Sequence, residues 1–328
     1  MLAFVAQRIA QTGLVMLTVA FVAFAMFHFI GDPINNMVSQ DATAEQREQV
    51  RRHLGLDDPF PLQFAYFISN AVHGDFGVSY RLSLPVGALI AERLPATLEL
   101  VFVAASIALL VGMPLGVYTG LYRRGVVSRL LLGLTLVGIS LPTFLTGLIL
   151  ILIFSLWLGW LPSFGRGEVV DLGIWSTGFL TASGRRALVL PSITLALFQL
   201  ALITRLVRAG MLEVLGSDYI RFARARGLPN RLVLFGHALK NTLVPVMTNV
   251  GLQIGALIAF AIITETVFQW PGMGLLFLQA IRFADIPVMA AYLMLTALLF
   301  GVINLAVDLL YGAIDPRVRG ESSHHKGS

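Results

Sequence analysis

The segment that decides the interpretation of this chain is Ser217–Pro245, SDYIRFARARGLPNRLVLFGHALKNTLVP, which lies between two long apolar runs. It begins with a short helical stretch whose ends are both marked. Ser217 or Asp218 is suited to cap the N-terminus, because a side-chain oxygen can accept from amides that lack a helical partner. Gly227 suits the left-handed residue that ends a helix, and Pro229 prevents its continuation. The sequence therefore predicts a helix of about two turns between these signals.

The predicted helix covers Tyr219–Arg226 and is marginal alone in water, so we expect its side chains to contact other protein. One face collects residues at i, i+3 and i+4, namely Tyr219, Phe222 and Ala223. Arg221 and Arg224 lie outside that face. An aromatic face with a cationic flank suits a groove on a partner protein. Arginines alone would equally mark the cytoplasmic side of a membrane protein, but that interpretation explains neither the cap nor the aromatic face.

Composition identifies the class of protein. Of the 328 residues, 57% are hydrophobic and 12% are charged, and the mean hydropathy is +0.81. A soluble domain carries about twice that charged fraction, and the apolar runs reach the roughly 20 residues that a membrane-spanning helix needs. The chain is therefore predicted to be an all-α integral membrane protein. The net charge of +5 does not indicate nucleic-acid binding, because the basic residues flank the apolar runs.

Six apolar runs are candidates for membrane-spanning helices. They are Ile9–Ile30, Ala96–Leu121, Leu130–Leu158, Leu188–Thr204, Val246–Phe268 and Pro287–Leu310. In the second run, Gly112, Gly116 and Gly120 favour close packing against a neighbouring helix. Pro142 lies within the third run. The fourth run is the shortest and carries Pro191 near its start, which makes it the weakest candidate.

The distribution of Lys and Arg predicts the orientation of these helices. With six spans both termini lie on one side of the membrane, and more than half of the 23 Lys and Arg residues fall on that side. Since segments rich in Lys and Arg face the cytoplasm, we expect both termini and Ser217–Pro245 to be cytoplasmic. Arg185 and Arg186 fall on the opposite side, against this trend.

The chain divides into four predicted parts. An N-terminal transmembrane helix covers 1–31, and an external segment covers 32–95. A core with five transmembrane helices covers 96–313 and includes the cytoplasmic loop 214–243, and a cytoplasmic tail covers 314–328. Within the external segment, Thr43–Leu54 and Phe60–Val72 have helical character. They predict either a small folded cap on the outer face or a helix on the membrane surface.

The sequence shows no pattern for catalysis or metal binding. It has no G-x-x-x-x-G-K-[ST] phosphate loop, no H-E-x-x-H motif and no cysteine. We therefore predict no catalytic residue, no metal site and no cofactor in this chain. His324 and His325 lie in the polar tail, where a disordered or non-native end explains them better than a metal site.

Polar residues within the predicted spans are candidates for a transport pathway. Asn249 with Gln253, and Asn304 with Asp308, are four residues apart, so each pair shares a helix face. Each pair would either line a polar route or form hydrogen bonds between helices. Glu265 lies near the outer end of the fifth run, where it would be a gate or an interfacial residue.

Eight short motifs follow one another along the chain. They are LGLDDPFPLQF (Leu54–Phe64), GDFGVSY (Gly74–Tyr80), RLPATLEL (Arg93–Leu100), SLPTF (Ser140–Phe144), DYIRFARARGL (Asp218–Leu228), HALKN (His237–Asn241), ETVFQWPGMG (Glu265–Gly274) and DPRVR (Asp315–Arg319). Together they resemble the permease subunits of bacterial dipeptide/oligopeptide ABC importers, a class that includes nickel and glutathione systems. Ala223, Gly227 and Leu239 match the general importer loop, whereas Arg221 and Phe222 replace its Glu and first Ala.

This resemblance implies a fold and a division of labour. It implies six transmembrane helices of the type I ABC importer permease fold, with a small external segment between helices 1 and 2, in a bacterial inner membrane. It also implies a second homologous permease, two ATP-binding subunits that hold ATP and Mg, and an external substrate-binding protein. The ATP-binding subunits would dock on Asp218, Tyr219, Ile220, Arg221, Phe222, Ala223, Arg224, Ala225, Arg226 and Gly227. Nickel chelates and glutathione are alternatives to peptides as substrate.

Other classes of membrane protein fit the sequence less well. An ion-coupled secondary carrier would place titratable residues within the membrane and commonly shows an internal repeat. Only Glu99, Glu265 and Asp308 are acidic within the predicted spans, and no repeat is visible. An ion channel would need a filter loop or a charged ring. A non-transporting scaffold is a further alternative, and co-purification of an ATPase would favour the importer over the carrier.

Overall fold

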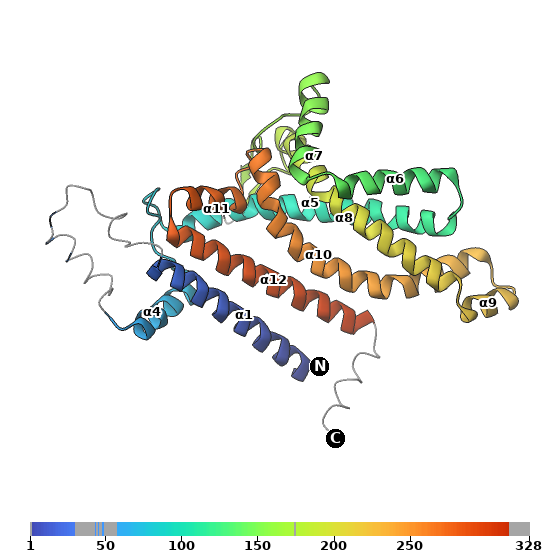
Figure 1. The fold of residues 1–328 in the computed structure, drawn as a ribbon, viewed down its shortest axis with the longest axis horizontal. Coiled ribbons are helices and arrows are strands. Elements are labelled where there is room, and N and C mark those ends of the chain that lie inside the picture. Colours follow the sequence, from blue (N-terminus) through green and yellow to red (C-terminus); the bar gives the residue numbers. More distant parts are fainter. Residues whose placement is uncertain are drawn as a thin grey trace.

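The computed structural model describes residues 2–29, 43, 45, 48, 58–173 and 175–314, and most of this part is helical (Figure 1). Its α-helices are α1 Leu2–Phe29, α4 Phe60–Val72, α5 Val86–Leu121, α6 Val126–Ser140, α7 Thr143–Leu150, α8 Ala182–Leu215, α9 Asp218–Ala225, α10 Lys240–Val267, α11 Met273–Arg282 and α12 Ile286–Ile314. Two segments are π-helical, η1 Ile151–Trp157 and η2 Leu232–Leu239. A short antiparallel hairpin pairs β1 Val170–Asp171 with β2 Ser176–Thr177. The predicted all-α class is confirmed.

Four of the described helices, α1, α5, α8 and α12, are each long and apolar enough to cross a membrane. α6 and the continuous α7–η1 segment pass the same test together, although they are bent by 110° at the break between them. α10 has 28 residues and includes the apolar stretch Gly255–Val267. At 1.5 Å per residue α10 is about 42 Å long, enough to cross a bilayer. These elements follow the six predicted runs in order, which is consistent with six spans.

The helix boundaries differ from the prediction at the prolines. α5 runs through Pro95, whereas the prediction began at Ala96. α8 runs through Pro191 and has 34 residues, so the expectation of a short fourth helix was wrong. Neighbouring helices re-satisfy the backbone groups that proline frees within a membrane. Pro142 does interrupt the third run, because Leu141 before it is extended, as residues that precede proline prefer.

α5 and α8 form the most extensive helix pair in the described structure. A Cβ added at Gly116 would lie 2.6 Å from the Cβ of Val207, and one at Gly120 would lie 2.8 Å from the Cβ of Met211. Any larger residue at these two positions would push the helices apart. The predicted role of these glycines in close packing is therefore confirmed, and the partner is α8.

The helices form an elongated bundle in which α1 lies along α12 and α10 packs against α8 and α12 (Figure 1). α9 lies at one end of the bundle, and α4 and α11 lie at the other (Figure 1). α7 points away from the bundle after the bend that follows α6 (Figure 1). α9 is thus separated from α4 by the full length of the membrane-spanning helices.

α4 confirms the predicted helix over Phe60–Val72 and packs on α1 through aromatic rings. Phe24 contacts Phe60 and Phe64, with ring centroids 5.0 and 5.4 Å apart. Apart from residues 43, 45 and 48, the predicted helix Thr43–Leu54 lies outside the described residues. Residues 315–328 of the predicted tail, with both of its histidines, also lie outside them.

Candidate functional site

The short predicted helix is present as α9, but its N-terminus is not capped as expected. Ser217 occupies the capping position with an extended backbone, yet no side-chain hydrogen bond closes the helix start. Its hydroxyl instead donates to the carbonyl oxygen of Val214, at 2.6 Å. Asp218 opens the helix and forms an exposed ion pair with Arg221, at 3.2 Å. A carboxylate in the first turn still favours the helix through the dipole of its backbone.

The C-terminus of α9 is built as predicted. Gly227 has φ +76°, a conformation in which a residue with a Cβ is strained. Its amide donates to the carbonyl of Arg224 at 2.9 Å, and the amide of Leu228 donates to that of Ala223 at 3.3 Å. These two bonds form a Schellman motif, which satisfies the last carbonyls of the helix.

One face of α9 is buried against its own chain. Ile220 is fully buried and Ala223 is 8% exposed, and both belong to the core cluster that contains Met211 of α8 and Val233 and Ala238 of η2. Ile220 and Ala223, both predicted to contact an ATP-binding subunit, pack within this chain instead. They help to fix α9 on the ends of α8 and η2, so that a displacement of α9 would press on both.

The opposite face of α9 is exposed. Phe222 is 61% exposed, and the guanidinium of Arg226 lies 4.9 Å from the centroid of its ring. Tyr219 is also exposed, and its hydroxyl accepts a hydrogen bond from Nδ2 of Asn241 at 2.7 Å. Arg221, Arg224 and Ala225 are exposed as well. The result is an aromatic and cationic surface on a helix whose other face packs against α8 and η2.

The predicted pathway residues are divided between α10 and α12. Gln253 on α10 and Asn304 on α12 are half-buried, and the side chains of Asn249 and Asp308 lie outside the described part. Oδ1 of Asn304 is buried without a hydrogen-bond partner. Among the described contacts, no hydrogen bond joins Gln253 to Asn304. Gln253 and Asn304 therefore lie on two packed helices, and no described hydrogen bond joins them.

Glu265 is fully buried and holds three elements together. Thr97 of α5 donates to its Oε1 at 2.6 Å, and the amide of Leu275 in α11 donates to its Oε2 at 2.9 Å. A Cβ at Gly272 would lie 2.3 Å from Oε1, so glycine is needed for the chain to pass this carboxylate. In this structure Glu265 ties α10 to α5 and α11.

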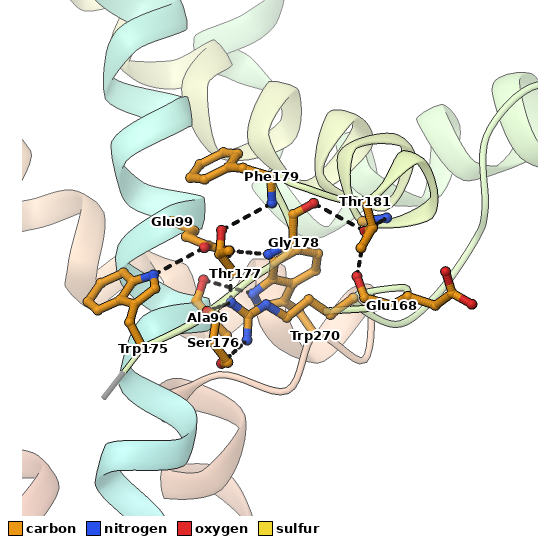
Figure 2. A network of polar contacts seen from close by, with 12 residues as sticks. Ala96, Glu99, Glu168, Trp175, Ser176, Thr177, Gly178, Phe179, Thr181 and Trp270 are labelled. Atoms are coloured by element: carbon orange, nitrogen blue, oxygen red, sulfur yellow. Dashed lines mark hydrogen bonds and ion pairs between the residues drawn. The ribbon is translucent and has the colours of Figure 1, made fainter. Parts of the chain in front are cut away.

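A second buried network lies two residues further along α5. Glu99 and Arg166 form an ion pair at 2.8 Å, with 2% and 6% of their side chains exposed. Arg166 also donates to the carbonyl and the hydroxyl of Ser176. Figure 2 shows Trp175 and Gly178 converging on Glu99, to which both donate, at 3.3 and 3.4 Å. The segment between α7–η1 and α8 is thus fastened to α5.

Sequence reasoning missed Arg166 and the hydrogen bond from Trp270 to the carbonyl of Ala96, at 3.0 Å (Figure 2). A signal for the ion pair was present, because a buried carboxylate such as Glu99 needs a partner. Arg166 stands between Gly165 and Gly167, both with positive φ, in a tightly turned segment. Nothing local to either residue specifies their pairing across the sequence.

Comparison with protein families gives two matches that together cover most of the chain. Residues 112–320 match the family described as binding-protein-dependent transport system inner membrane component. Residues 1–101 match the N-terminal region of binding-protein-dependent transport system membrane components.

Relatives match over nearly the whole length. The dipeptide transport system permease protein DppB of Escherichia coli (strain K12) is 37% identical, covering 97% of this chain and 99% of the relative. A putative peptide transport system permease protein of Brucella abortus (strain 2308) is 39% identical over the same shares. The glutathione transport system permease protein GsiC of Escherichia coli O1:K1 / APEC is 38% identical, again over 97% and 99%.

Among solved structures, an inward-facing conformation of the MetNI methionine ABC transporter has a similar fold. The TM-score is 0.54 at 19% identity, and the match covers 69% of this chain and 96% of the other. At this identity the likeness concerns the fold alone.

Proposed function

Because this chain belongs to the family of binding-protein-dependent transport system inner membrane components, we propose that it forms half of the membrane pathway of an ATP-driven importer for dipeptides and oligopeptides. The chain is a permease subunit of the ABC importer class. Permease subunits of this class are themselves non-catalytic. The observation that carries the proposal is α9, a short helix with one face locked into the bundle and the other presented to a partner.

α9 docks in a groove on an ATP-binding subunit through its exposed side chains. Phe222 and Tyr219 enter the groove. Arg221 and Arg224 of α9 contact carboxylates or carbonyls at the edge of that groove. Ile220 and Ala223 then transmit movement of the partner to α8 and η2, on which they pack. ATP and Mg are held by two such subunits, and their closing and opening turns the pathway outward and inward.

The remaining partners follow from the same architecture. A second, homologous permease completes the pathway, and an external binding protein delivers the substrate. Both termini and α9 face the cytoplasm, whereas α4 and α11 lie outside. Reporter tags at residue 125, in the loop 214–243 and at the C-terminus should therefore be cytoplasmic, and a tag at residue 170 should be external. An external signal from the loop would contradict the orientation and the docking role together.

Gln253 and Asn304 are proposed to line the route, since the structure leaves them half-buried without a bond between them. The chain contains no cysteine, so Gln253→Cys can be labelled selectively. Its reaction with a small polar thiol reagent should change when ATP is trapped on the complex. If no state of the complex allows labelling, Gln253 lies between helices and does not face the route.

The substrate class is supported by relatives that are named for dipeptide and peptide transport. Glutathione is the second candidate, because a relative of nearly equal identity is named for it. The complete complex in proteoliposomes, with its binding protein, should take up a labelled dipeptide only when ATP is enclosed with the ATP-binding subunits. Uptake of glutathione in place of the dipeptide would assign the second candidate. Uptake driven by an ion gradient without ATP would refute the importer.

A further inference from the structure

Two turns meet at the end of the bundle that lies opposite α9. The first covers residues 78–85 and leads into α5, and the second covers residues 281–285, which are the last two residues of α11 and the link to α12. In the first turn the amide of Ser79 donates to the carbonyl of Leu84 at 2.9 Å, and Val78 pairs with Pro85 in an isolated β-bridge. We name these two turns together the outer clasp.

The outer clasp is held by one buried carboxylate. Asp285, 3% exposed, accepts from the hydroxyl of Ser79 at 2.5 Å and from the amides of Tyr80 and Arg81 at 3.1 and 3.4 Å. The guanidinium of Arg81 lies 3.8 Å from the centroid of the Phe283 ring, which joins the turns a second time. A carboxylate with three donors fixes two backbone segments that are far apart in the sequence.

The clasp presents apolar side chains to the outside. Its large exposed hydrophobic residues are Val78, Leu82, Leu84, Ile281 and Phe283, the last 54% exposed. Ser83 and Ala284 have φ of 54° and 51°, a region in which non-glycine residues are strained. A buried anchor and two strained turns thus hold in place a surface whose apolar groups would gain from being covered.

Lipid does not account for this surface. Glu92 and Arg93 form an ion pair at 3.5 Å, with 65% and 32% of their side chains exposed, and lie on α5 between the clasp and the apolar run. A membrane core excludes such a pair, so the hydrocarbon begins near Ala96. The first turn of the clasp ends at Pro85, about 16 Å further out at 1.5 Å per residue. The clasp therefore stands in water, beyond the acyl chains.

The charge on the clasp indicates the chemistry of what covers it. Arg81 and Arg282 are exposed, and Asp285, the one carboxylate within residues 78–85 and 281–285, is buried and bonded. Burial, together with the charge of Asp285, raises the pKa of Tyr80 to about 12, so this phenol stays neutral at physiological pH. An apolar centre with a cationic rim fits a partner with apolar groups and an acidic rim.

We propose that the outer clasp is a docking surface for the external substrate-binding protein, which contributes an apolar patch bordered by carboxylates. This inference rests on the proposed function, because it assumes an importer fed by such a protein. The position favours this partner over the second permease. The clasp lies at the tip of the bundle, beyond the hydrocarbon, whereas two permeases that form one pathway must meet within the membrane.

The test uses the complete complex in nanodiscs and measures ATP hydrolysis as the binding protein is titrated. Leu82→Asp should raise the concentration that gives half-maximal stimulation at least tenfold, because the new charge faces an acidic rim. Leu82→Lys, at the same site, should raise it less. Leu172→Asp places the same charge on an exposed external residue away from the clasp and should leave it near the wild-type value. Basal hydrolysis and recovery of the complex should not change.

A second measurement does not depend on the effect of a charge. Leu82→Cys, in a chain without other cysteines, can carry a photo-crosslinker, which should capture the binding protein and no permease. Unchanged stimulation in the Leu82→Asp complex, or capture of the second permease alone, would overturn the proposal. Failure of the wild-type complex to respond to any binding protein would instead count against the proposed function, so the two failures are distinguishable.

Discussion

Replacing Gly227 with valine tests whether the shape of α9 matters for coupling. Gly227 has φ +76°, and a β-branched residue in this conformation costs about 1–2 kcal/mol. A Cβ at this position would meet nothing within 4 Å, so the cost is conformational strain and involves no collision. A change of this size lowers the ratio of capped to uncapped helix by roughly 5- to 30-fold.

The strain is relieved by giving up the two hydrogen bonds that end α9, from the amides of Gly227 and Leu228. Without them the last turn extends or unwinds, and Phe222 loses its fixed position relative to the partner. The membrane-spanning helices do not include this residue, so insertion and pairing of the permeases should persist. We expect a complex of near-normal abundance that hydrolyses ATP weakly or without coupling, and whose import falls at least fivefold.

The assay compares import and ATP hydrolysis in proteoliposomes, with hydrogen exchange of the Leu228 amide as the local reporter. Gly227→Asn is the matched control, because asparagine tolerates the left-handed conformation, and it should retain most of the import. The decisive contrary result is a valine variant whose Leu228 amide exchanges rapidly while import stays at the wild-type rate. In that case the shape of α9 is not used for coupling, and the segment only marks the cytoplasmic side.

Three further predictions test docking and packing. Phe222→Glu should abolish coupling in a stable protein, whereas Ala223→Glu buries a charge and should lower the thermal unfolding temperature as well; equal unfolding temperatures would contradict the two-faced helix. Glu99→Gln leaves Arg166 buried without a counter-charge and should cost about 3–5 kcal/mol of stability. The loss should appear as faster proteolysis of the segment between η1 and α8, and it should be smaller when Arg166→Met is added. Gly116→Val should cost about 1–3 kcal/mol through overpacking, and an unchanged unfolding temperature would show that α5 and α8 are free to separate.

Local signals in the sequence were sufficient where one residue decides the conformation. Gly227 followed by Pro229 specified the end of α9, because the left-handed turn needs no information from elsewhere. The glycines at four-residue spacing in α5 likewise predicted a close helix pair, although not the identity of the partner. Hydropathy located the spans, since an apolar run of sufficient length has few other stable environments.

The sequence was insufficient where two local choices have similar energies. Ser217 has a carbonyl within reach behind it as well as amides ahead, and its hydroxyl takes the carbonyl of Val214. α9 carries apolar side chains on both faces, so spacing cannot say whether Phe222 or Ile220 faces the core. Those choices depend on where the ends of α8 and η2 lie, which is a property of the whole bundle.

α5 connects the end of the bundle that carries α9 with the opposite end. At the end of α5 opposite α9, the carbonyl of Ala96 accepts from Trp270, between α10 and α11, and Thr97 donates to Glu265 of α10. Glu99 accepts from the amide of Gly178, in the segment that precedes α8. Further along α5, its glycines lock it against α8, whose 34 residues run without a break almost to α9. Packed interfaces of this kind move as units and resist gradual deformation. A partner that displaces α9 must therefore also displace the contacts of Ala96, Thr97 and Glu99, unless α5 and α8 slide past each other.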